Sequence, residues 1–119
     1  MRILFVDDDA DSLRVYGTIL ASRGHDVTGV LSGVDAIDEL TRDHRFDVVI
    51  TDYDMPGIKG DTTLSLIHAR WPDLPVVLIS SHDGLDQRAR DIGAAAYLRK
   101  PCPAETLLRT LRELSRTQP

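Results

Sequence analysis

The sequence is poor in the features that mark secreted, membrane-bound and nucleic-acid-binding proteins. Its single cysteine, Cys102, excludes an internal disulfide and fits a reducing cytosol. No apolar run approaches the ~20 residues of a membrane-spanning helix, and Met1 and Arg2 lead into a strand-like segment rather than a signal peptide. A net charge of −5 argues against direct nucleic-acid binding. We therefore expect a cytoplasmic protein that contacts neither membrane nor nucleic acid.

What the chain does contain is typical of a soluble globular domain. Hydrophobic residues make up 42% and charged residues 28% of its 119 residues, enough for one α/β core. The sequence has no internal repeat, linker or low-complexity stretch, so we predict a single domain over 1–119. No output domain follows the last predicted helix, which leaves either a stand-alone domain or one excised from a longer protein.

Strand-like and helix-like patterns alternate five times along the chain. Short apolar segments predict strands over 2–6, 26–30, 47–51, 76–80 and 95–99. Helices are predicted over 9–22, after Ser32, over 61–71, near 85–92 and from Pro103 onward. The fourth helix has few apolar residues, which suits a movable element. Such alternation predicts a doubly wound, five-stranded parallel sheet with helices on both faces.

Two acidic sites, far apart in the sequence, each follow an apolar strand-like segment. Asp7 and Asp8 follow the first strand and Asp52 follows the third, whereas Asp9 is expected to start a helix. Because parallel strands open at one edge of a sheet, these carboxylates should share a crevice. At ~4 Å and an effective dielectric of ~20, each like-charge pair costs roughly 4 kcal/mol. The cluster therefore predicts a cation, and its hard oxygen ligands favour Mg²⁺.

Two other strands end in a hydroxyl and an amine. Ser80 ends the fourth strand and Lys100 follows the fifth. Read one at a time, these are an ordinary loop serine and a surface lysine. Together with the acidic cluster they are the parts of phosphoryl transfer, in which a carboxylate accepts, cations neutralise the phosphoryl oxygens and a hydroxyl donates a hydrogen bond.

With these residues in place, the chain resembles the receiver domain of two-component response regulators over essentially its whole length. The resemblance implies the flavodoxin-like strand order 2-1-3-4-5 and a phosphorylation-dependent signalling switch rather than a turnover enzyme. The matching motifs are Val6-Asp7-Asp8, Asp52 with Met55-Pro56 and Gly60, Ser80-Ser81, Gly93-Ala94 with Tyr97, and Lys100-Pro101.

The resemblance also implies roles for single residues. Asp52 would be the phosphoacceptor, and Ser80 and Lys100 would contact the phosphoryl group. Phosphorylation would draw in the Ser80 hydroxyl, and Tyr97, the switch aromatic, would fill the vacated space. The Mg²⁺ ligands would be Asp7, Asp8, Asp52 and the backbone carbonyl of Asp54.

The same resemblance implies the partners of the domain. A histidine kinase or a histidine phosphotransfer protein would supply the phosphoryl group. A downstream protein would bind the surface formed by the fourth helix, fifth strand and fifth helix, and the switch is compatible with a phosphorylation-linked homodimer.

Two further expectations concern the surroundings of the acceptor. Asp54 and His82 flank it by sequence, and we expect them to set the lifetime of the phosphoryl group by orienting or excluding water. The Lys100–Pro101 peptide bond is expected to be cis, partly by resemblance and partly because X–Pro is where a cis bond costs only ~0.5–1 kcal/mol.

Two other interpretations come from different classes of protein. A haloacid-dehalogenase-like phosphatase would use the D-x-D spacing within Asp7-Asp8-Asp9, but Ala10 stands where that motif usually has Thr or Val, and the chain has no length for a cap. A phosphorylation-independent interaction domain of the same fold would have no need for clustered carboxylates. Turnover of an aryl phosphate would support the first interpretation, and failure to bind Mg²⁺ the second.

Overall fold

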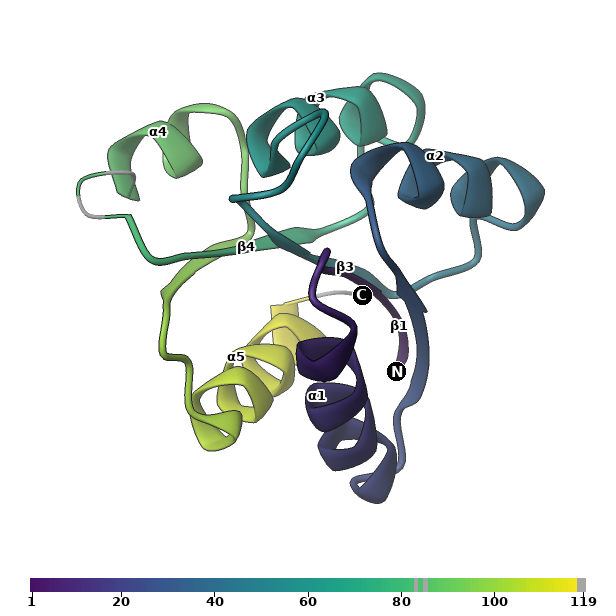
Figure 1. Ribbon diagram of the computed structural model, residues 1–119, viewed down its shortest axis with the longest axis vertical. Coiled ribbons are helices and arrows are strands. Elements are labelled where there is room, and N and C mark those ends of the chain that lie inside the picture. The colour runs from purple at the N-terminus through teal and green to yellow at the C-terminus, as the bar shows by residue number, and fades with distance from the viewer. Residues whose placement is uncertain (83, 85, 118–119) are drawn as a thin grey trace.

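One parallel sheet organises the computed structural model, which describes residues 1–82, 84 and 86–117 (Figure 1). Within these residues five strands alternate with five helices. The strands are β1 (Arg2–Val6), β2 (Asp26–Val30), β3 (Val48–Asp52), β4 (Val76–Ser80) and β5 (Ala96–Arg99). The helices are α1 (Ala10–Ser22), α2 (Gly33–Arg42), α3 (Gly60–Arg70), α4 (Asp86–Asp91) and α5 (Ala104–Thr117).

The strand order is β2-β1-β3-β4-β5, and every neighbouring pair is parallel. This confirms the predicted fold class and strand order. The boundaries differ by a residue in places: β3 begins at Val48 and includes Asp52, and α3 begins at Gly60 and ends at Arg70. Of the apolar residues near the fourth helix, Leu85 lies outside the described residues.

Helices cover both faces of the sheet, with α1 and α5 on one side and α2, α3 and α4 on the other (Figure 1). Alternate side chains of β1 serve the two layers. Ile3 and Phe5 pack against the α1–α5 layer, and Leu4 and Val6 against the other. Because both faces are covered, the central strands β1, β3 and β4 are continuous apolar runs that become polar only at their ends.

The helix starts follow from capping chemistry. The Asp9 carboxylate accepts from the amides of Asp11 and Ser12, so Asp9 is the N-cap of α1 and not its first residue. The Ser32 hydroxyl accepts from the amide of Asp35 in the same way at α2. These caps fix where each chain segment leaves the carboxyl edge of the sheet.

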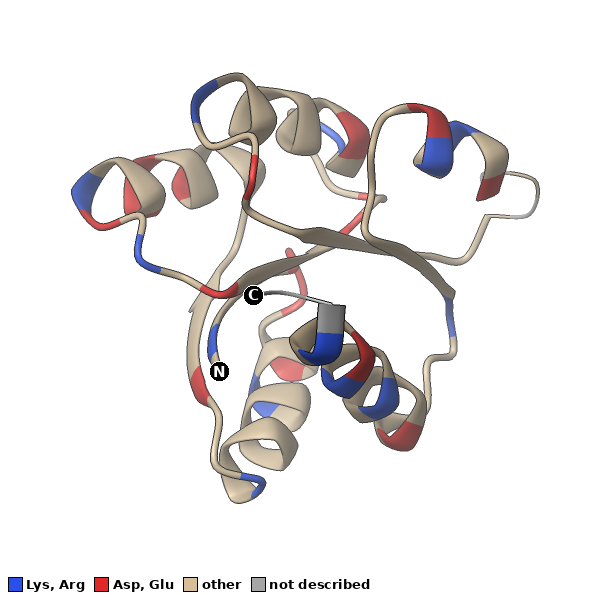
Figure 2. Cartoon of the chain, turned by 180° about the vertical axis from the view of Figure 1, so that it is seen from behind, with Lys and Arg blue, Asp and Glu red and all other residues tan. Residues whose placement is uncertain are grey.

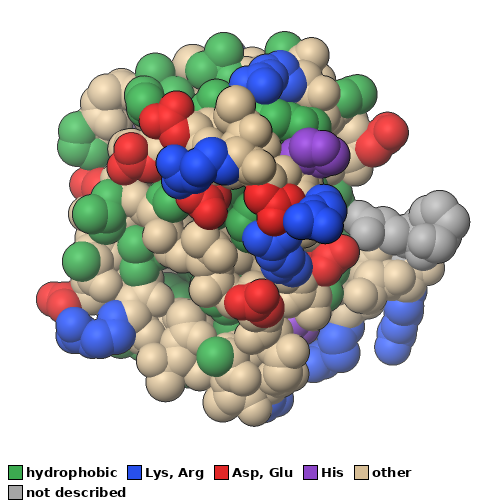
Figure 3. Space-filling view, turned by 90° about the vertical axis from the view of Figure 1, so that its right-hand side faces the viewer, with side chains coloured by type: hydrophobic (Ala, Val, Ile, Leu, Met, Phe, Trp, Pro, Cys, Tyr) green, Lys and Arg blue, Asp and Glu red, His purple; other side chains and the backbone are tan. Residues whose placement is uncertain are grey.

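Charge is distributed unevenly over the ribbon. Acidic segments follow β1 and stand at the end of β3, at the carboxyl edge of the sheet (Figure 2). The face in Figure 3 instead intersperses acidic, basic and apolar side chains. Across residues 1–82, 84 and 86–117, no helix combines the length and apolar character that a bilayer-spanning segment requires.

Candidate functional site

The three predicted carboxylates meet at the carboxyl edge of the sheet. β1 and β3 are neighbours, with Val6 paired to Thr51, so the residues that follow Val6 lie beside Asp52. One oxygen each of Asp7, Asp8 and Asp52 lies within 4.8 Å of the others. Asp7 and Asp52 are only 4% and 3% exposed. Such a donor set, with oxygens from two strands and an exposed side at Asp8, fits a small hard cation.

Lys100 provides the positive charge of the site. Its Nζ lies 2.9 Å from Oδ2 of Asp52. Burial opposes the charged form of the amine, but the hydrogen bond to Asp52 and the nearby carboxylate charges outweigh it and raise the pKa of Lys100. At Asp7, burial and the negative charge of Asp52 raise the pKa of the carboxyl. The site is therefore an ammonium held among crowded carboxylates.

A glycine lets the loop after β3 fold back onto Asp52. A Cβ at Gly60 would lie 2.6 Å from the Asp52 carbonyl oxygen, which no side chain tolerates. The Gly60 amide donates to the carbonyl of Tyr53 at 2.9 Å, and the Asp54 amide donates to Oδ1 of Asp52 at 3.2 Å. The sequence motif around Gly60 thus reflects a close approach of two backbone segments.

Ser80, Asp54 and His82 form a polar cluster beside the acceptor. The fully buried Ser80 hydroxyl lies 3.4 Å from Oδ2 of Asp54 and accepts from the His82 amide at 3.0 Å. Nε2 of His82 is 2.6 Å from Oδ1 of Asp54. Asp54 therefore joins the loop after β3 to the loop after β4, a contact that sequence position alone did not specify.

Tyr97 reaches the same loop from β5. Its hydroxyl donates to the His82 backbone carbonyl at 2.7 Å. The side chain borders a small space shared with Leu78, Ala89 and Ile92. Tyr97 is thus linked to Ser80 through the backbone of His82. The His82 amide donates to the Ser80 hydroxyl, and the His82 carbonyl accepts from the Tyr97 hydroxyl.

The segment after β5 is held by a contact that the sequence did not reveal. The Lys100–Pro101 bond is cis, as predicted. The Tyr16 hydroxyl donates to the carbonyl of Cys102 at 2.6 Å, tying α1 to this segment. The sequence offers one indication of this contact, because a tyrosine on the apolar face of a helix needs a hydrogen-bond partner for its hydroxyl. A cavity of about 440 Å³ lies between α1 and the segment after β5, and Asp52 forms part of its wall.

Known proteins share this fold. The model of the response regulator receiver domain matches residues 3–112. The chain belongs to this family. A receiver domain protein from Clostridium thermocellum superposes with a TM-score of 0.91 at 30% identity, covering 97% of this chain and 94% of that one. The chemotaxis response regulator CheY4 of Vibrio cholerae gives 0.87 at 26% identity, with 95% and 97% covered.

Curated relatives are longer than this receiver chain. The response regulator FleR of Pseudomonas aeruginosa is 37% identical over 109 residues, 90% of this chain and 23% of that protein. MprA of Mycobacterium avium is 34% identical over 122 residues, covering 100% of this chain and 53% of that protein. The chain thus spans from about a quarter to about half of these two relatives. The family consists of signalling domains rather than typical turnover enzymes, which argues against the phosphatase interpretation.

Proposed function

We propose that this receiver domain is a Mg²⁺-dependent switch that is phosphorylated on Asp52 by a histidine kinase or a histidine phosphotransfer protein. The observation that carries the proposal is the position of Asp52, which is buried at the end of β3, pairs with Lys100 at 2.9 Å and lies beside Asp7 and Asp8. A purely structural aspartate would have no need of the two additional carboxylates.

The transfer uses the chain's own groups. A carboxylate oxygen of Asp52 attacks the phosphorus of a donor phosphohistidine in line, the P–N bond breaks, and its electron pair stays on the departing imidazole. The Lys100 ammonium offsets charge on the phosphoryl oxygens. Mg²⁺ would be held by Asp7, Asp8, Asp52 and the Asp54 carbonyl, and when bound it supplies further positive charge there.

The switch follows from competition for one hydroxyl. Ser80 lies against Asp54, and an acyl phosphate on Asp52 would draw that hydroxyl toward itself. Because the His82 amide is bonded to Ser80 and its carbonyl to Tyr97, the loop and the tyrosine would move together. The altered surface is that of α4, β5 and α5, where we expect a downstream protein to bind. Couplings of this kind are typically ~1–3 kcal/mol.

Intact-mass measurement with acetyl phosphate and Mg²⁺ tests the proposal. We expect one added phosphoryl group, none in Asp52→Asn, and normal labelling in the control Asp47→Asn at the opposite edge of the sheet. Undiminished labelling of Asp52→Asn would contradict the assignment. No labelling of the wild type together with no Mg²⁺ binding in calorimetry would favour the phosphorylation-independent interaction domain.

A further inference from the structure

The outer face of α5 carries an arginine stripe, which consists of Arg109, Arg112 and Arg116. Because they are spaced three and four residues apart, all three lie on one side of the helix. The opposite side of α5 faces the core, where Leu107 and Leu111 are buried. Basic segments recur along α5 in Figure 2, and the three arginines are exposed.

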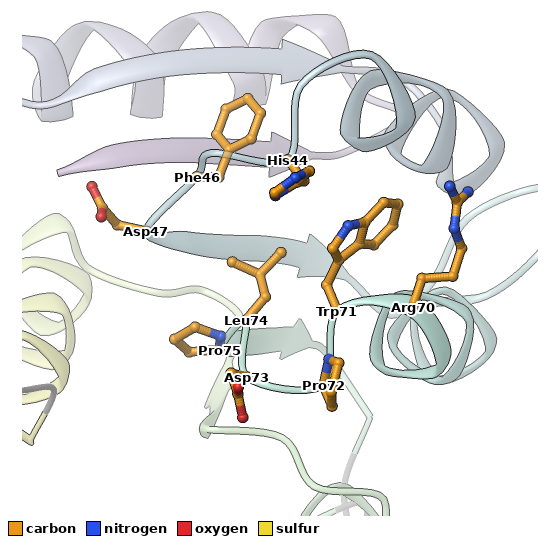
Figure 4. A pocket seen from close by; sticks show the side chains of 9 residues that line it. All are labelled: His44, Phe46, Asp47, Arg70, Trp71, Pro72, Asp73, Leu74 and Pro75. Carbon is orange, nitrogen blue, oxygen red and sulfur yellow. The ribbon is translucent and has the colours of Figure 1, made fainter.

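The arginines of the stripe differ from the others of the chain in their contacts. Within residues 1–82, 84 and 86–117, none of their three side chains makes a hydrogen bond or an ion pair. Each of the other arginines interacts with another group of the chain. Arg70, beside Trp71 in Figure 4, donates to the Thr41 hydroxyl at 2.8 Å, and its guanidinium carbon lies 4.4 Å from the Trp71 ring centroid. The stripe therefore presents guanidinium groups that can bind a partner without breaking an internal contact.

The stripe continues the face of α5 that contacts α1. Glu105 lies four residues before Arg109, on the same side of the helix, and pairs with Arg23 at the end of α1 at 3.1 Å. In Figure 1, α1 and α5 lie side by side in one layer, whereas α4 lies across the sheet. The stripe is thus on the α1 side of α5 and points away from α4.

The electrostatics of the helix itself explain only part of the stripe. A cation in the last turn of a helix is stabilised by the helix dipole, which accounts for Arg116. Arg109 stands in the second turn, nearer to the positive end of that dipole. Glu113, one turn after Arg109, forms no ion pair with any residue of the described chain. Three neighbouring like charges repel one another, so an acidic partner would stabilise them.

The charge of the rest of the chain favours one kind of acidic partner. The net charge of the whole chain is −5, so the chain outside the stripe is more acidic still. A DNA duplex or an anionic membrane would bring negative charges within a Debye length, about 8 Å, of these carboxylates and be repelled. The stripe spans only about 10 Å along the helix axis at ~1.5 Å per residue. A single acidic helix can contact the stripe without approaching the other carboxylates.

We propose that the arginine stripe binds an acidic helix of a partner protein. On a helix that runs antiparallel to α5, carboxylates at positions i, i+4 and i+7 would face Arg116, Arg112 and Arg109 in turn. Each guanidinium would form a charge-assisted, hydrogen-bonded pair with one carboxylate. The contact uses no residue of the phosphorylation site, so it is independent of Asp52.

Two stapled helical peptides of the same composition test the charge pattern. One carries glutamates at i, i+4 and i+7 of an alanine-rich helix, and the other distributes the same glutamates around the helix. Each is titrated into the isotopically labelled chain while the amide NMR shifts of 109–116 are followed. We expect saturable shifts with the first peptide and binding of the second at least about fivefold weaker, as for the loss of exposed ion pairs.

A charge exchange tests the arrangement of the pairs. Arg112→Glu should weaken binding of the first peptide, and a peptide whose central glutamate is replaced by arginine should restore it. The control Arg90→Glu on α4 should leave the affinity for both peptides unchanged. Asp52→Asn should bind the first peptide as the wild type does, so failure of the phosphorylation proposal stays distinguishable.

Four results would overturn the proposal. They are an absence of saturable shifts in 109–116, equal binding of the two glutamate peptides, an unchanged affinity in Arg112→Glu, and tighter binding of a polyanion. A short DNA duplex and vesicles of phosphatidylserine and phosphatidylcholine are the polyanionic probes. Binding of the glutamate peptide should also weaken as salt is raised, since exposed charges are screened.

Discussion

Arg88 of α4 forms an ion pair with Asp61 in the first turn of α3, with 2.7 Å between Nη2 and Oδ2. The Asp61 side chain is only 14% exposed and that of Arg88 58%. Burial alone would raise the pKa of Asp61, but the hydrogen bonds from Arg88 and the Thr62 amide outweigh it and lower that pKa. α4 has six residues and buries only Ala89 among them, so this ion pair adds to the few packed contacts that hold α4 against the body.

Replacing Arg88 by glutamine should therefore loosen α4. Exposed ion pairs contribute about 0.2–1 kcal/mol, so local opening should become up to about fivefold more frequent. Hydrogen exchange over 86–91 measures this directly. Arg90→Gln on the same helix is the matched control, since Arg90 contacts Gln87 of its own helix. Equal protection of α4 in the two variants would contradict the prediction.

The same ion pair predicts a pH dependence. The folded pKa of Asp61 lies below its usual value of 3.8, so its contribution is fully present above that pH and is lost as the pH falls through the folded value. The difference in unfolding free energy between wild type and Asp61→Asn should accordingly be constant from neutral pH to about 4 and shrink below it. Urea denaturation at a series of pH values measures the difference. A difference that stays constant down to pH 2 would show that Asp61 and Arg88 do not interact.

Much of the fold could be predicted from local patterns. The bounds of β1, β2 and β4 agree with the predicted strands. In β1 and β4 the reason is a short apolar run that stops at a polar residue, Asp7 after β1 and Ser80 at the end of β4. β3 was misplaced by one residue because its end depends on the ladder, which continues past Asp52 through the bond from the Tyr53 amide to the Ile79 carbonyl. A neighbouring strand supplies that bond, so the sequence of β3 does not contain it.

The convergence of Asp7, Asp8 and Asp52 was predictable because parallel strands share one open edge. The contacts of Arg88 with Asp61 and of Tyr16 with Cys102 were not, since they span 27 and 86 residues. Each depends on how a helix is rotated on the sheet and on the rotamer of a long side chain. Periodicity fixes the buried face of a helix but leaves these details open.

Removal of a single acid should separate metal binding from stability. Asp8 is exposed and shares its cluster with two buried carboxylates. Asp8→Ala should abolish Mg²⁺ binding and leave the metal-free melting temperature equal or higher, because one like charge is removed. Calorimetric titration and thermal unfolding with and without Mg²⁺ measure both effects. A marked fall of the metal-free melting temperature would indicate a structural role for Asp8.

Lys100→Ala should destabilise the fold, because it leaves the buried Asp52 carboxylate without its ammonium partner. Breaking a fully buried ion pair costs about 3–5 kcal/mol, and since Lys100 is partly exposed we expect about 1–3 kcal/mol. In an Asp52→Asn background the same substitution should cost much less. Urea denaturation of the four proteins gives this cycle, and an identical cost in both backgrounds would show that the pair is not coupled.

The pair of His82 and Asp54 should slow hydrolysis of the phosphorylated domain. Its 2.6 Å contact joins the two loops beside the acceptor, and the Tyr53 ring lies edge-on to His82 with centroids 5.9 Å apart. Water must enter here to attack the acyl phosphate in line, so opening the contact should admit it. We expect His82→Ala to lose the phosphoryl group several-fold faster, with His44→Ala at the opposite edge as the control.

If the two side chains act as one barrier, removing either one removes it. Asp54→Ala and the double variant with His82→Ala should then decay at nearly the same rate as His82→Ala alone, whereas independent effects would multiply. The decay of the phosphorylated mass after removal of acetyl phosphate gives all four rates. Rates that multiply, or a His82→Ala decay equal to that of the wild type, would show that water reaches the acceptor by another route.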